Sequence, residues 1–414
     1  MSVRMANVKK PFLISYQNEK DQVTVGKFLS AMSMTGIQAL RDPRLKLTCR
    51  AFKHIQKESH QEGEPIEALT VSKEEFASCI SANIVLISKI LRNRLIISRW
   101  QEFCDHIGDI FYKCKENTTG QKATYIPHLA DIDPELWGLS ICTVDGQRLS
   151  IGDTKVPFCI QSCHKPYTYA LALNDLTAER VHEYVGQEPS GRHSNEICLD
   201  HNNKPHNPLI NSGALAICSL IDPKAKLAER YDYVLRYYKR VAGGDYVGFN
   251  NGVFLSERDV ADRNHAIAYY MRENECFPQT TDLKETLDLY LQLSSVEINC
   301  ESGAVMAATL ANGGICPITD DVAIHEDGIR DVLSLMYSCG MADYSGHFAF
   351  RIGLPAKSAL SGCVHLVVPN CMGICLWSPR LDCYNNSARA VQFCEELVKR
   401  FNFHNYDNLR MAEK

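Results

Sequence analysis

The chain has 414 residues, a formal net charge of -5, and 45% hydrophobic and 22% charged residues. This length allows two or three domains with at least one large buried core, and the composition is typical of a soluble globular protein. The slightly acidic balance argues against nucleic acid as the main partner, because phosphate binding usually requires a basic surface. The longest apolar run, residues 81–100, contains Lys89, Arg92 and Arg94, so we expect no membrane-spanning segment.

Eighteen cysteines are present, and no two of them are spaced as Cys-x-x-Cys. The nearest pairs, Cys159 with Cys163 and Cys371 with Cys375, are four residues apart and have no clustered histidines. The length of the chain and the lack of a signal peptide argue against a secreted disulfide scaffold. We therefore expect reduced, mostly buried thiols and no metal site.

The first region, residues 1–118, is predicted to be helical. Ser72 and Glu75 are placed to form a capping box at the start of one helix. No calcium-binding loop of the Asp-x-Asp-x-Asp-Gly kind is present in the sequence, so calcium binding is not expected. Apolar residues recur at helical spacing in three segments, residues 27–37, 72–91 and 99–114.

The second region is predicted to begin with a β-hairpin around Asp145-Gly146, a pair that suits a tight type I′ turn. Mostly helical sequence follows from about residue 162 to 340. Strand patterns then return, and residues 387–401 are predicted to form a closing helix. Strands at both ends with helices between them predict an α+β domain, in which helices pack on one antiparallel sheet. The later strands are expected in residues 347–354, 363–370 and 372–379.

The segment QSCHKPYTYALAL contains the single Ser-x-x-Lys of the chain, Ser162 and Lys165. A serine hydroxyl needs a base to act as a nucleophile, and residues three apart lie on one face of a helix. Pro166 favours a helix start here, where burial and the positive helix end lower the pKa of a lysine amine. Alone the motif is weak, because it arises often by chance and an ordinary polar helix edge is the alternative.

Lys357-Ser358, before a late strand, resembles the Lys-Thr-Gly element of penicillin-binding proteins and class A β-lactamases. A β-lactam hydrolase is a minor alternative, since those enzymes work outside the cytoplasm. Longer motifs are more specific, and with them the chain resembles the serine-dependent glutaminases, specifically the kidney-type and liver-type animal enzymes, from about residue 12 to 409. These motifs are YIPHLADIDPELWGLSICTVDGQR, GDTKVPFCIQSCHKP, YVGQEPSG, KPHNPLINSGA, YVGFNNGVFLSERDVADRN, CESGAVMAATLANGG, GLPAKS and FHNYDNLR.

The resemblance implies an enzyme that hydrolyses L-glutamine to L-glutamate and ammonia through a Ser-Lys acyl-enzyme. It implies a β-lactamase-like domain at residues 119–409, with an antiparallel sheet and helices. A small all-helical EF-hand-like domain at residues 1–118 would precede it, with residues 115–124 as the linker and residues 410–414 as a tail.

The resemblance also implies a homo-oligomer, a dimer or a tetramer, with no nucleic acid or membrane partner. No cofactor is expected, although phosphate activation is possible in this family. A mitochondrial location follows from the resemblance, and Arg4, Lys9 and Lys10 are a weak sign of a presequence. A cytosolic location stays open.

The resemblance assigns roles residue by residue. Ser162 matches the nucleophile and Lys165 its base, and Tyr125 matches a tyrosine that lines the catalytic site. The backbone N–H groups of Ser162 and Leu360 would form an oxyanion hole. A carboxylate suits the substrate ammonium group and amides suit its carboxylate. The implied substrate-binding side chains are Asn211, Glu257, Asn264 and Tyr290.

Two departures from the family pattern fall at the chemistry. The family has a catalytic tyrosine directly after Cys-Gly-Met, where this chain has Ala342. Tyr344 follows two residues later. In an extended segment, the side chains of residues two positions apart point to the same side. Tyr344 could replace the missing phenol only after a backbone shift of several ångströms. The family's Lys-Ser-Gly-Val-x-Gly-Gly also carries Ala359 and Cys363 in place of glycines, which is a problem if Ala359 needs a positive φ.

A third departure lies in the loop of residues 191–204, which in the family gates the site and contacts the neighbouring subunit through central aromatic residues. Here it carries His193, Ser194 and Cys198 instead, which puts phosphate activation and family-type assembly in doubt. Two hypotheses on function are consistent with the sequence. One is an active glutaminase. The other is a catalytically impaired glutaminase-like protein that binds glutamine or glutamate, or that co-assembles with an active paralogue.

Overall fold

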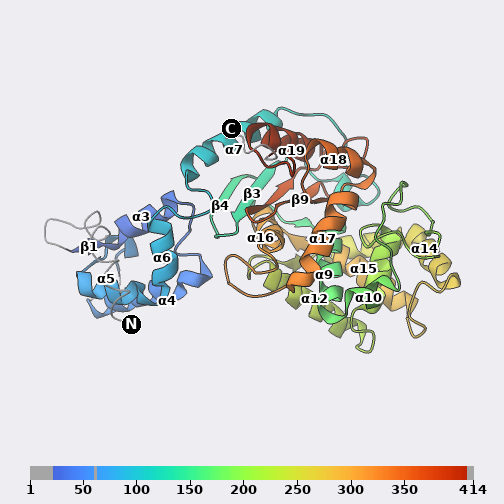
Figure 1. Ribbon diagram of the computed structural model, residues 1–414, viewed down its shortest axis with the longest axis horizontal. Coiled ribbons are helices and arrows are strands. Elements are labelled where there is room, and N and C mark those ends of the chain that lie inside the picture. The colour runs from blue at the N-terminus through green and yellow to red at the C-terminus, as the bar shows by residue number, and fades with distance from the viewer. Residues whose placement is uncertain (1–21, 60–62, 408–414) are drawn as a thin grey trace. The chain divides into compact units, whose positions relative to one another are not determined.

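The computed structural model describes residues 22–59 and 63–407 and divides into two compact units (Figure 1). The first unit consists of the chain up to His106 together with Asp145–Leu149 and Ile318–Asp320. The remaining residues form the second unit. The basic N-terminal residues and the tail at 410–414 lie outside the described residues, and the boundary at residue 118 stays a prediction. No helix in the described ranges is long and apolar enough to cross a membrane.

The first unit is built on an aromatic core. The rings of Phe28, Phe52 and Phe76 lie with their centroids 5.2 to 6.0 Å apart, and each side chain is 1% exposed. The predicted capping box is confirmed, because Glu75 N–H donates to Ser72 Oγ and Ser72 N–H donates to a Glu75 carboxylate oxygen. The helices are α3 (Val25–Met34), α4 (Lys46–Glu58), α5 (Lys73–Ile80), α6 (Ile84–Leu91) and the start of α7 (Trp100–Lys115), with 3-10 turns at Pro43–Leu45, Ile66–Ala68 and Ser81–Asn83.

The prediction of an all-helical first unit is wrong in one detail. Strands β1 (Val23–Thr24) and β2 (Thr70–Val71) pair antiparallel. The β-branched residues Val23 and Val71 face each other in this pair and are fully buried, 0% and 1% exposed. β-branched side chains favour extended backbone, so two short strands form where helical periodicity gives no signal.

The second unit contains the sheet that the sequence predicts. Its strand order is β4-β3-β10-β9-β8, and the β3–β10, β10–β9 and β9–β8 pairs are antiparallel, so the early hairpin lies beside the late strands. The register between β3 and β10 aligns Ile141 with Ile374. The bounds are β3 (Gly138–Thr143), β4 (Arg148–Gly152), β8 (Ala356–Ser358), β9 (Cys363–Val368) and β10 (Met372–Trp377).

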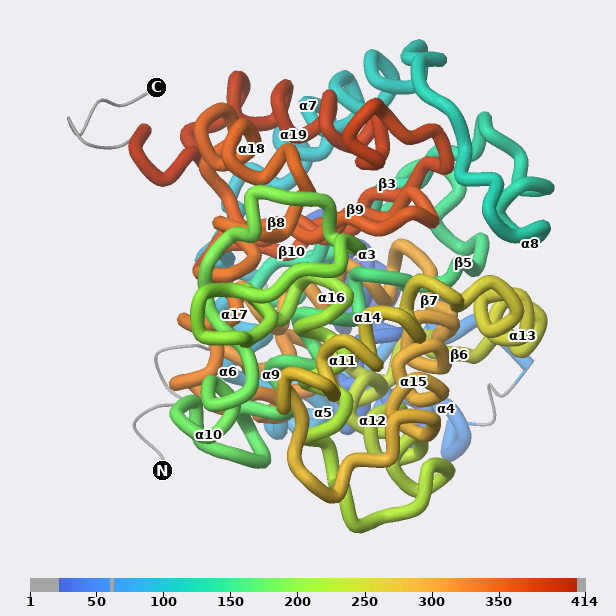
Figure 2. Tube along the Cα trace, turned by 90° about the vertical axis from the view of Figure 1, so that its right-hand side faces the viewer, coloured from blue at the N-terminus to red at the C-terminus, as the bar shows by residue number. Residues whose placement is uncertain are grey.

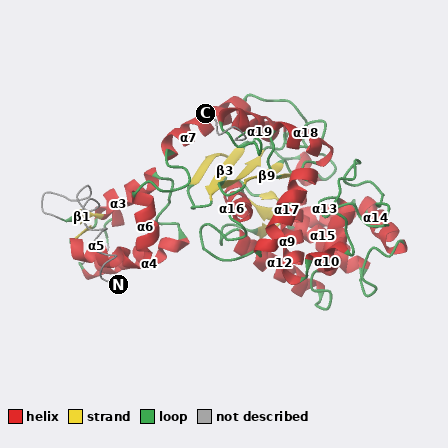
Figure 3. Cartoon of the chain, in the orientation of Figure 1, coloured by secondary structure: helices red, strands yellow, loops and turns green. Residues whose placement is uncertain are grey.

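Helices cover this sheet on both faces (Figures 1 and 3). Helix α16 (Cys300–Ala311) lies so close to β10 that a Cβ on Gly373 would be 2.0 Å from the Ala308 nitrogen. Helix α19 (Ala388–Arg400), predicted as the closing helix, covers the opposite face, where Phe393 packs edge-on against Trp137. The α+β class with a β-lactamase-like arrangement is therefore confirmed.

A second layer of helices lies beyond α16 and surrounds a small sheet of order β5-β7-β6. The predicted helical stretch from 162 to 340 is thus interrupted by two short strands of this sheet. The remaining elements of the second unit are α8 (Pro127–Ala130), β5 (Phe158–Cys159), the 3-10 turn η4 (Gln161–His164), α9 (Lys165–Asp175), α10 (Ala178–His182), α11 (Asn211–Leu220), α12 (Leu227–Val241), β6 (Gly248–Phe249), α13 (Asn251–Asp259), α14 (Asp262–Glu273), α15 (Leu283–Ser294), β7 (Val296–Ile298), α17 (Glu326–Cys339), the 3-10 turn η5 (Ala342–Tyr344) and α18 (Ser345–Arg351).

The strand predicted at residues 347–354 is wrong, because most of this segment belongs to helix α18. Its alternating aromatic pattern suggested a strand. Phe350 is nevertheless 85% exposed, whereas Phe348 and Ile352, four residues apart, are buried. Burial at i and i+4 is the helical period, so packing of one helix face decides the structure.

Candidate active site

A cavity of about 990 Å³ opens beside β8 in the second unit, among η4, α11, α13, α14, α15 and η5. It brings together every residue that the sequence predicts for the site. The tube in Figure 2 shows the loop between α10 and α11 passing in front of β8, and residues of this loop line the same cavity. The predicted residues that line it are Tyr125, Ser162, Lys165, Asn211, Glu257, Asn264, Tyr290 and Leu360.

Ser162 and Lys165 lie where β5 leads into a helix, as predicted. Gln161 takes a left-handed backbone conformation with φ of 47° directly before Ser162. Turn η4 then continues into α9, with Lys165 as its first residue. The Lys165 side chain is buried, and burial lowers the pKa of its amine well below the usual value, with the neighbouring Lys357 charge adding to the effect. A neutral amine can accept a proton.

Asn211 connects Lys165 to the next helix. The Lys165 Nζ donates to Asn211 Oδ1 at 2.7 Å, and Asn211 Nδ2 donates to Asn264 Oδ1 at 3.2 Å. The Lys165 Nζ also lies 5.9 Å from the ring centroid of Tyr290. The Asn264 carbonyl oxygen accepts the hydrogen bond from Asn211, so the Asn264 NH₂ group remains as a donor. Asn264 also lines the cavity.

Glu257 is a buried carboxylate held by two donors. The Tyr125 hydroxyl donates to Glu257 Oε1 at 2.5 Å, and Gln161 Nε2 donates to the same oxygen at 2.7 Å. Burial raises the pKa of Glu257, and the two hydrogen bonds partly oppose this shift. Gln161 is not predicted from the sequence, because its role depends on a left-handed backbone conformation that no sequence motif indicates.

Strand β8 and the turn after it also line the cavity, with Lys357 close enough to Lys165 for its charge to act on that amine. Ala359 N–H donates to Cys363 O, and Gly362 N–H donates to Ala359 O, which closes a tight turn around Leu360. Ala359 does not have a positive φ, so its methyl group does not strain the backbone. Lys357 also lines the cavity, and burial lowers the pKa of its amine.

Ala342 lines the cavity. The suggestion that Tyr344 could replace the missing phenol assumes an extended segment here, and this assumption is wrong. The segment is not extended: residues 342–344 form turn η5, and Ala342 has φ of 50°. Tyr344 is absent from the cavity lining, and its ring stacks on His347 and packs against Tyr384 with centroids 5.1 Å apart. Tyr384 does line the cavity. It is not predicted from the sequence, because it lies some forty positions further along the chain.

The loop of residues 191–204 reaches across to η5. His193 Nδ1 lies 2.7 Å from a carboxylate oxygen of Asp343. Within the loop, Arg192 pairs with Glu196 at 2.7 Å. Both pairs are exposed to solvent, so we expect each to contribute little to the stability of the closed loop.

Comparison with known proteins adds to this geometry. Residues 120–406 match the family model described as Glutaminase, and residues 12–98 match a model described as an EF-hand domain. The chain belongs to the glutaminase family. Putative glutaminase 2 of Caenorhabditis elegans is 52% identical over 394 residues, which cover 94% of this chain and 65% of that protein. The mitochondrial liver isoform of glutaminase from Mus musculus is 49% identical, over 94% of this chain and 64% of that protein.

Solved structures of glutaminases share the fold. The probable glutaminase ybaS superposes with a TM-score of 0.71 and 32% sequence identity, over 74% of this chain and 98% of that one. Mglu in its glutamate form superposes with a TM-score of 0.68 and 34% identity, over 75% of this chain and 70% of that one. The glutaminase chain described here spans slightly less than two thirds of the length of the two animal relatives named above.

Proposed function

We propose that this protein hydrolyses L-glutamine to L-glutamate and ammonia, with Ser162 as nucleophile and Lys165 as its base. The observation that carries the proposal is the buried Lys165 amine, one helical turn from Ser162 and hydrogen-bonded to Asn211 Oδ1 at 2.7 Å. A neutral amine that donates one hydrogen to Asn211 keeps its lone pair free to accept the serine proton. Family membership supports the same reaction.

In the first half of the proposed reaction, Ser162 Oγ attacks the carbon of the glutamine side-chain amide while its proton moves to Lys165. The negative oxygen that develops is bound by the backbone N–H groups of Ser162 and Leu360, a contribution worth roughly 10²–10³ in rate per donor. The C–N bond then breaks, the Lys165 ammonium supplies a proton, and ammonia leaves. The product of this half is an ester between Ser162 and the glutamyl side chain.

In the second half, a water molecule attacks the ester carbon and passes a proton to Lys165. The C–O bond to Ser162 breaks, Ser162 regains its proton, and glutamate leaves. All steps use side chains, backbone N–H groups and water, so we propose that the protein needs no cofactor. Whether phosphate raises the rate is tested by adding it to the assay.

The opposite end of the substrate is proposed to bind between two helices. The Glu257 carboxylate faces the cavity from α13 and suits the α-ammonium group. The Asn264 amide from α14 is a donor for the α-carboxylate, and Tyr290 forms a wall beside Lys165. The solved structure of Mglu in its glutamate form, at 34% identity, supports a pocket for this amino acid in the fold.

The decisive experiment measures ammonia release from glutamine by the native protein and by Ser162→Ala and Ala342→Tyr. We expect turnover in the native protein and a loss of at least about 10³-fold in Ser162→Ala. Native protein without turnover, together with turnover restored in Ala342→Tyr, would instead favour the impaired protein that only binds glutamine. Calorimetry with glutamine on Ser162→Ala then measures binding separately from chemistry.

We propose a mitochondrial location and a homo-oligomer, either a dimer or a tetramer. The location rests on similarity to the liver isoform from Mus musculus, which is described as mitochondrial. Fractionation of cells that express the full-length protein tests the location. Light scattering of the purified protein, with and without phosphate, tests the oligomeric state.

A further inference from the structure

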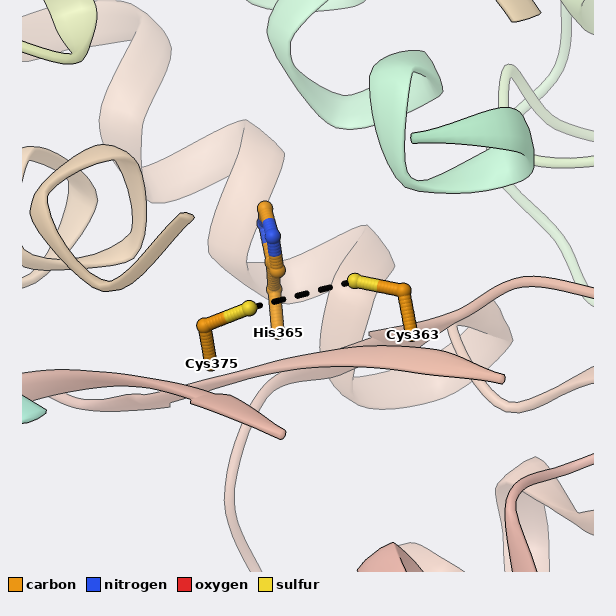
Figure 4. Close-up of side chains that lie close together, drawn as sticks. All are labelled: Cys363, His365 and Cys375. Atoms are coloured by element: carbon orange, nitrogen blue, oxygen red, sulfur yellow. Dashed lines mark hydrogen bonds between the residues drawn. The ribbon is translucent and has the colours of Figure 1, made fainter. Parts of the chain in front are cut away.

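Three potential metal ligands lie together inside the second unit, beneath the turn that carries Leu360. They are Cys363, His365 and Cys375, and their ligand atoms all lie within 4.8 Å of one another (Figure 4). All three side chains are fully buried. They have no role in the proposed hydrolysis.

Strand register explains why these residues meet. Cys363 and His365 are two positions apart on β9, so they point to the same face of the sheet. On β10, Cys375 is aligned with His365. The sequence spacing of Cys-x-His followed by a cysteine ten positions later matches no common metal motif, and only the pairing of β9 with β10 brings the three together.

The distance between the sulfur atoms suits a shared ion and not a disulfide. Cys363 Sγ and Cys375 Sγ lie 4.0 Å apart, about twice the length of an S–S bond. Two thiolates that bind one tetrahedral Zn²⁺ with Zn–S bonds of about 2.3 Å are separated by about 3.8 Å. The free side chains therefore already hold the spacing that a zinc ion requires.

His365 points an unused nitrogen into the same space. Its Nδ1 is hydrogen-bonded to the Tyr167 hydroxyl at 2.8 Å, which fixes the ring. Its Nε2 is buried and has no nitrogen or oxygen partner, and the ring interacts with the Cys375 thiol. A zinc-bound histidine characteristically has its second nitrogen held by a hydrogen bond in this way.

Gly303 of α16 packs directly against these atoms, with no room for a side chain. A Cβ at this position would lie 2.6 Å from Cys375 Sγ and 2.9 Å from His365 Nε2. The same helix carries Cys300, which is also fully buried, but its sulfur is not among the ligand atoms that lie within 4.8 Å of one another. Two thiols and one imidazole therefore form a Cys₂His donor set, and cysteine and histidine are the usual protein ligands of zinc.

We propose that Cys363, His365 and Cys375 bind one Zn²⁺ ion. Because the site is fully buried, the ion enters as the chain folds and stabilises the folded state. It would join β9 to β10 next to the Leu360 turn, since the Cys363 carbonyl oxygen accepts the hydrogen bond from Ala359 N–H that closes this turn. The site is independent of the catalytic chemistry, and its test does not depend on turnover.

The experiment measures the metal content of the full chain, produced in medium with added zinc and freed of loosely bound metal by gel filtration. We expect one zinc per chain in the native protein by mass spectrometry. We expect at least a tenfold loss of zinc in Cys375→Ser and in His365→Leu. The matched control is Cys394→Ser, because Cys394 is equally buried but lies on α19, and this variant should keep its zinc.

Cobalt gives a second readout that works on the native sequence. Protein refolded with Co²⁺ should show thiolate-to-cobalt charge-transfer absorption, which weakens in Cys375→Ser and stays in Cys394→Ser. Gly303→Ala keeps every ligand but adds a methyl group that clashes with Cys375 Sγ and His365 Nε2, so it should also lower the zinc content. A native protein that carries no zinc and gives no such absorption would overturn the proposal. Zinc that persists in both ligand variants, or copper in its place, would overturn it equally.

Discussion

The Lys165 Nζ donates to Asn211 Oδ1 at 2.7 Å, and this contact fixes the orientation of two amides. With its oxygen toward Lys165, Asn211 must turn its NH₂ group toward Asn264, whose own NH₂ group is then left for a ligand. One buried amine thus orders groups on α9, α11 and α14. The predicted base and the predicted carboxylate-binding amide belong to one hydrogen-bonded chain.

Lys165→Met should abolish turnover and stabilise the fold. Because burial lowers the pKa of this amine in the folded state, the unfolded chain binds a proton that the folded chain lacks. This difference in bound protons lowers the free energy of unfolding as the pH falls below the ordinary lysine pKa. The loss reaches its full size below the lowered pKa of the folded state. We expect kcat to fall by at least about 10³-fold and the melting temperature at neutral pH to rise by several degrees.

Thermal unfolding between neutral and alkaline pH checks this sign. The gain in melting temperature of Lys165→Met over the native protein should shrink as the pH approaches the ordinary lysine value. Lys399→Met is the control, since Lys399 is an exposed residue of α19. A destabilised Lys165→Met would contradict the proposed neutral amine.

Tyr384→Phe should lower kcat more than Tyr344→Phe. Tyr384 lines the cavity together with Ala342, whereas Tyr344 does not. In the family a tyrosine at the position of Ala342 transfers a proton. If the Tyr384 hydroxyl takes over this transfer, its removal should lower kcat by roughly 10²-fold. Steady-state kinetics with glutamine distinguishes the two variants, and equal kcat values would exclude Tyr384 from proton transfer.

The sequence predicts most of the site, because its residues lie within long motifs. Ser162, Lys165, Asn211 and Glu257 were found in this way, and their convergence on one cavity follows from the fold. Tyr384 could not be found by motif, since its place in the cavity depends on how the chain after β10 returns past η5. Likewise α18 reads as a strand until the exposure of Phe350 and the burial of Phe348 are known.

Glu257 should control substrate affinity in a pH-dependent way. Its pKa is raised by burial, so the carboxylate that binds an ammonium group is lost at a higher pH than for an exposed glutamate. The KM for glutamine should therefore rise as pH falls through this raised pKa. Glu257→Gln should raise KM by roughly 10- to 100-fold at neutral pH, as expected for hydrogen bonds to charged groups.

Tyr125→Phe is a sharper variant of the same test. It removes a donor that stabilises the Glu257 carboxylate at 2.5 Å, so the rise in KM should begin at a higher pH than in the native protein. A KM that does not depend on pH in the acidic range would argue against Glu257 as the ammonium ligand.

Asp343→Ala should have little effect on catalysis. The pair between His193 and Asp343 joins side chains that are 78% and 34% exposed, and exposed ion pairs contribute about 0–1 kcal/mol. We expect kcat/KM to change by less than about fivefold. A larger loss would mean that the loop of residues 191–204 must be held closed for turnover.

Phe76→Ala should destabilise the first unit by about 3–5 kcal/mol, the usual cost of removing a large side chain from a packed core. Phe76 packs against both Phe28 and Phe52. Phe350→Ala is the matched control, because Phe350 is 85% exposed and its loss should change the unfolding free energy by less than about 0.5 kcal/mol. Hydrogen exchange of α3, α4 and α5 measures the effect where it occurs.

The two donors on Glu257 Oε1 have a consequence for selectivity. Since Tyr125 and Gln161 hold the carboxylate in place before any ligand arrives, the anion loses little rotational freedom on binding and cannot turn away from a poorly matched partner. Free glutamine offers it a cation. A glutamine residue inside a polypeptide offers only a neutral amide, which would leave a buried charge unpaired. We therefore expect the protein to hydrolyse free glutamine and not the glutamine side chains of proteins and peptides.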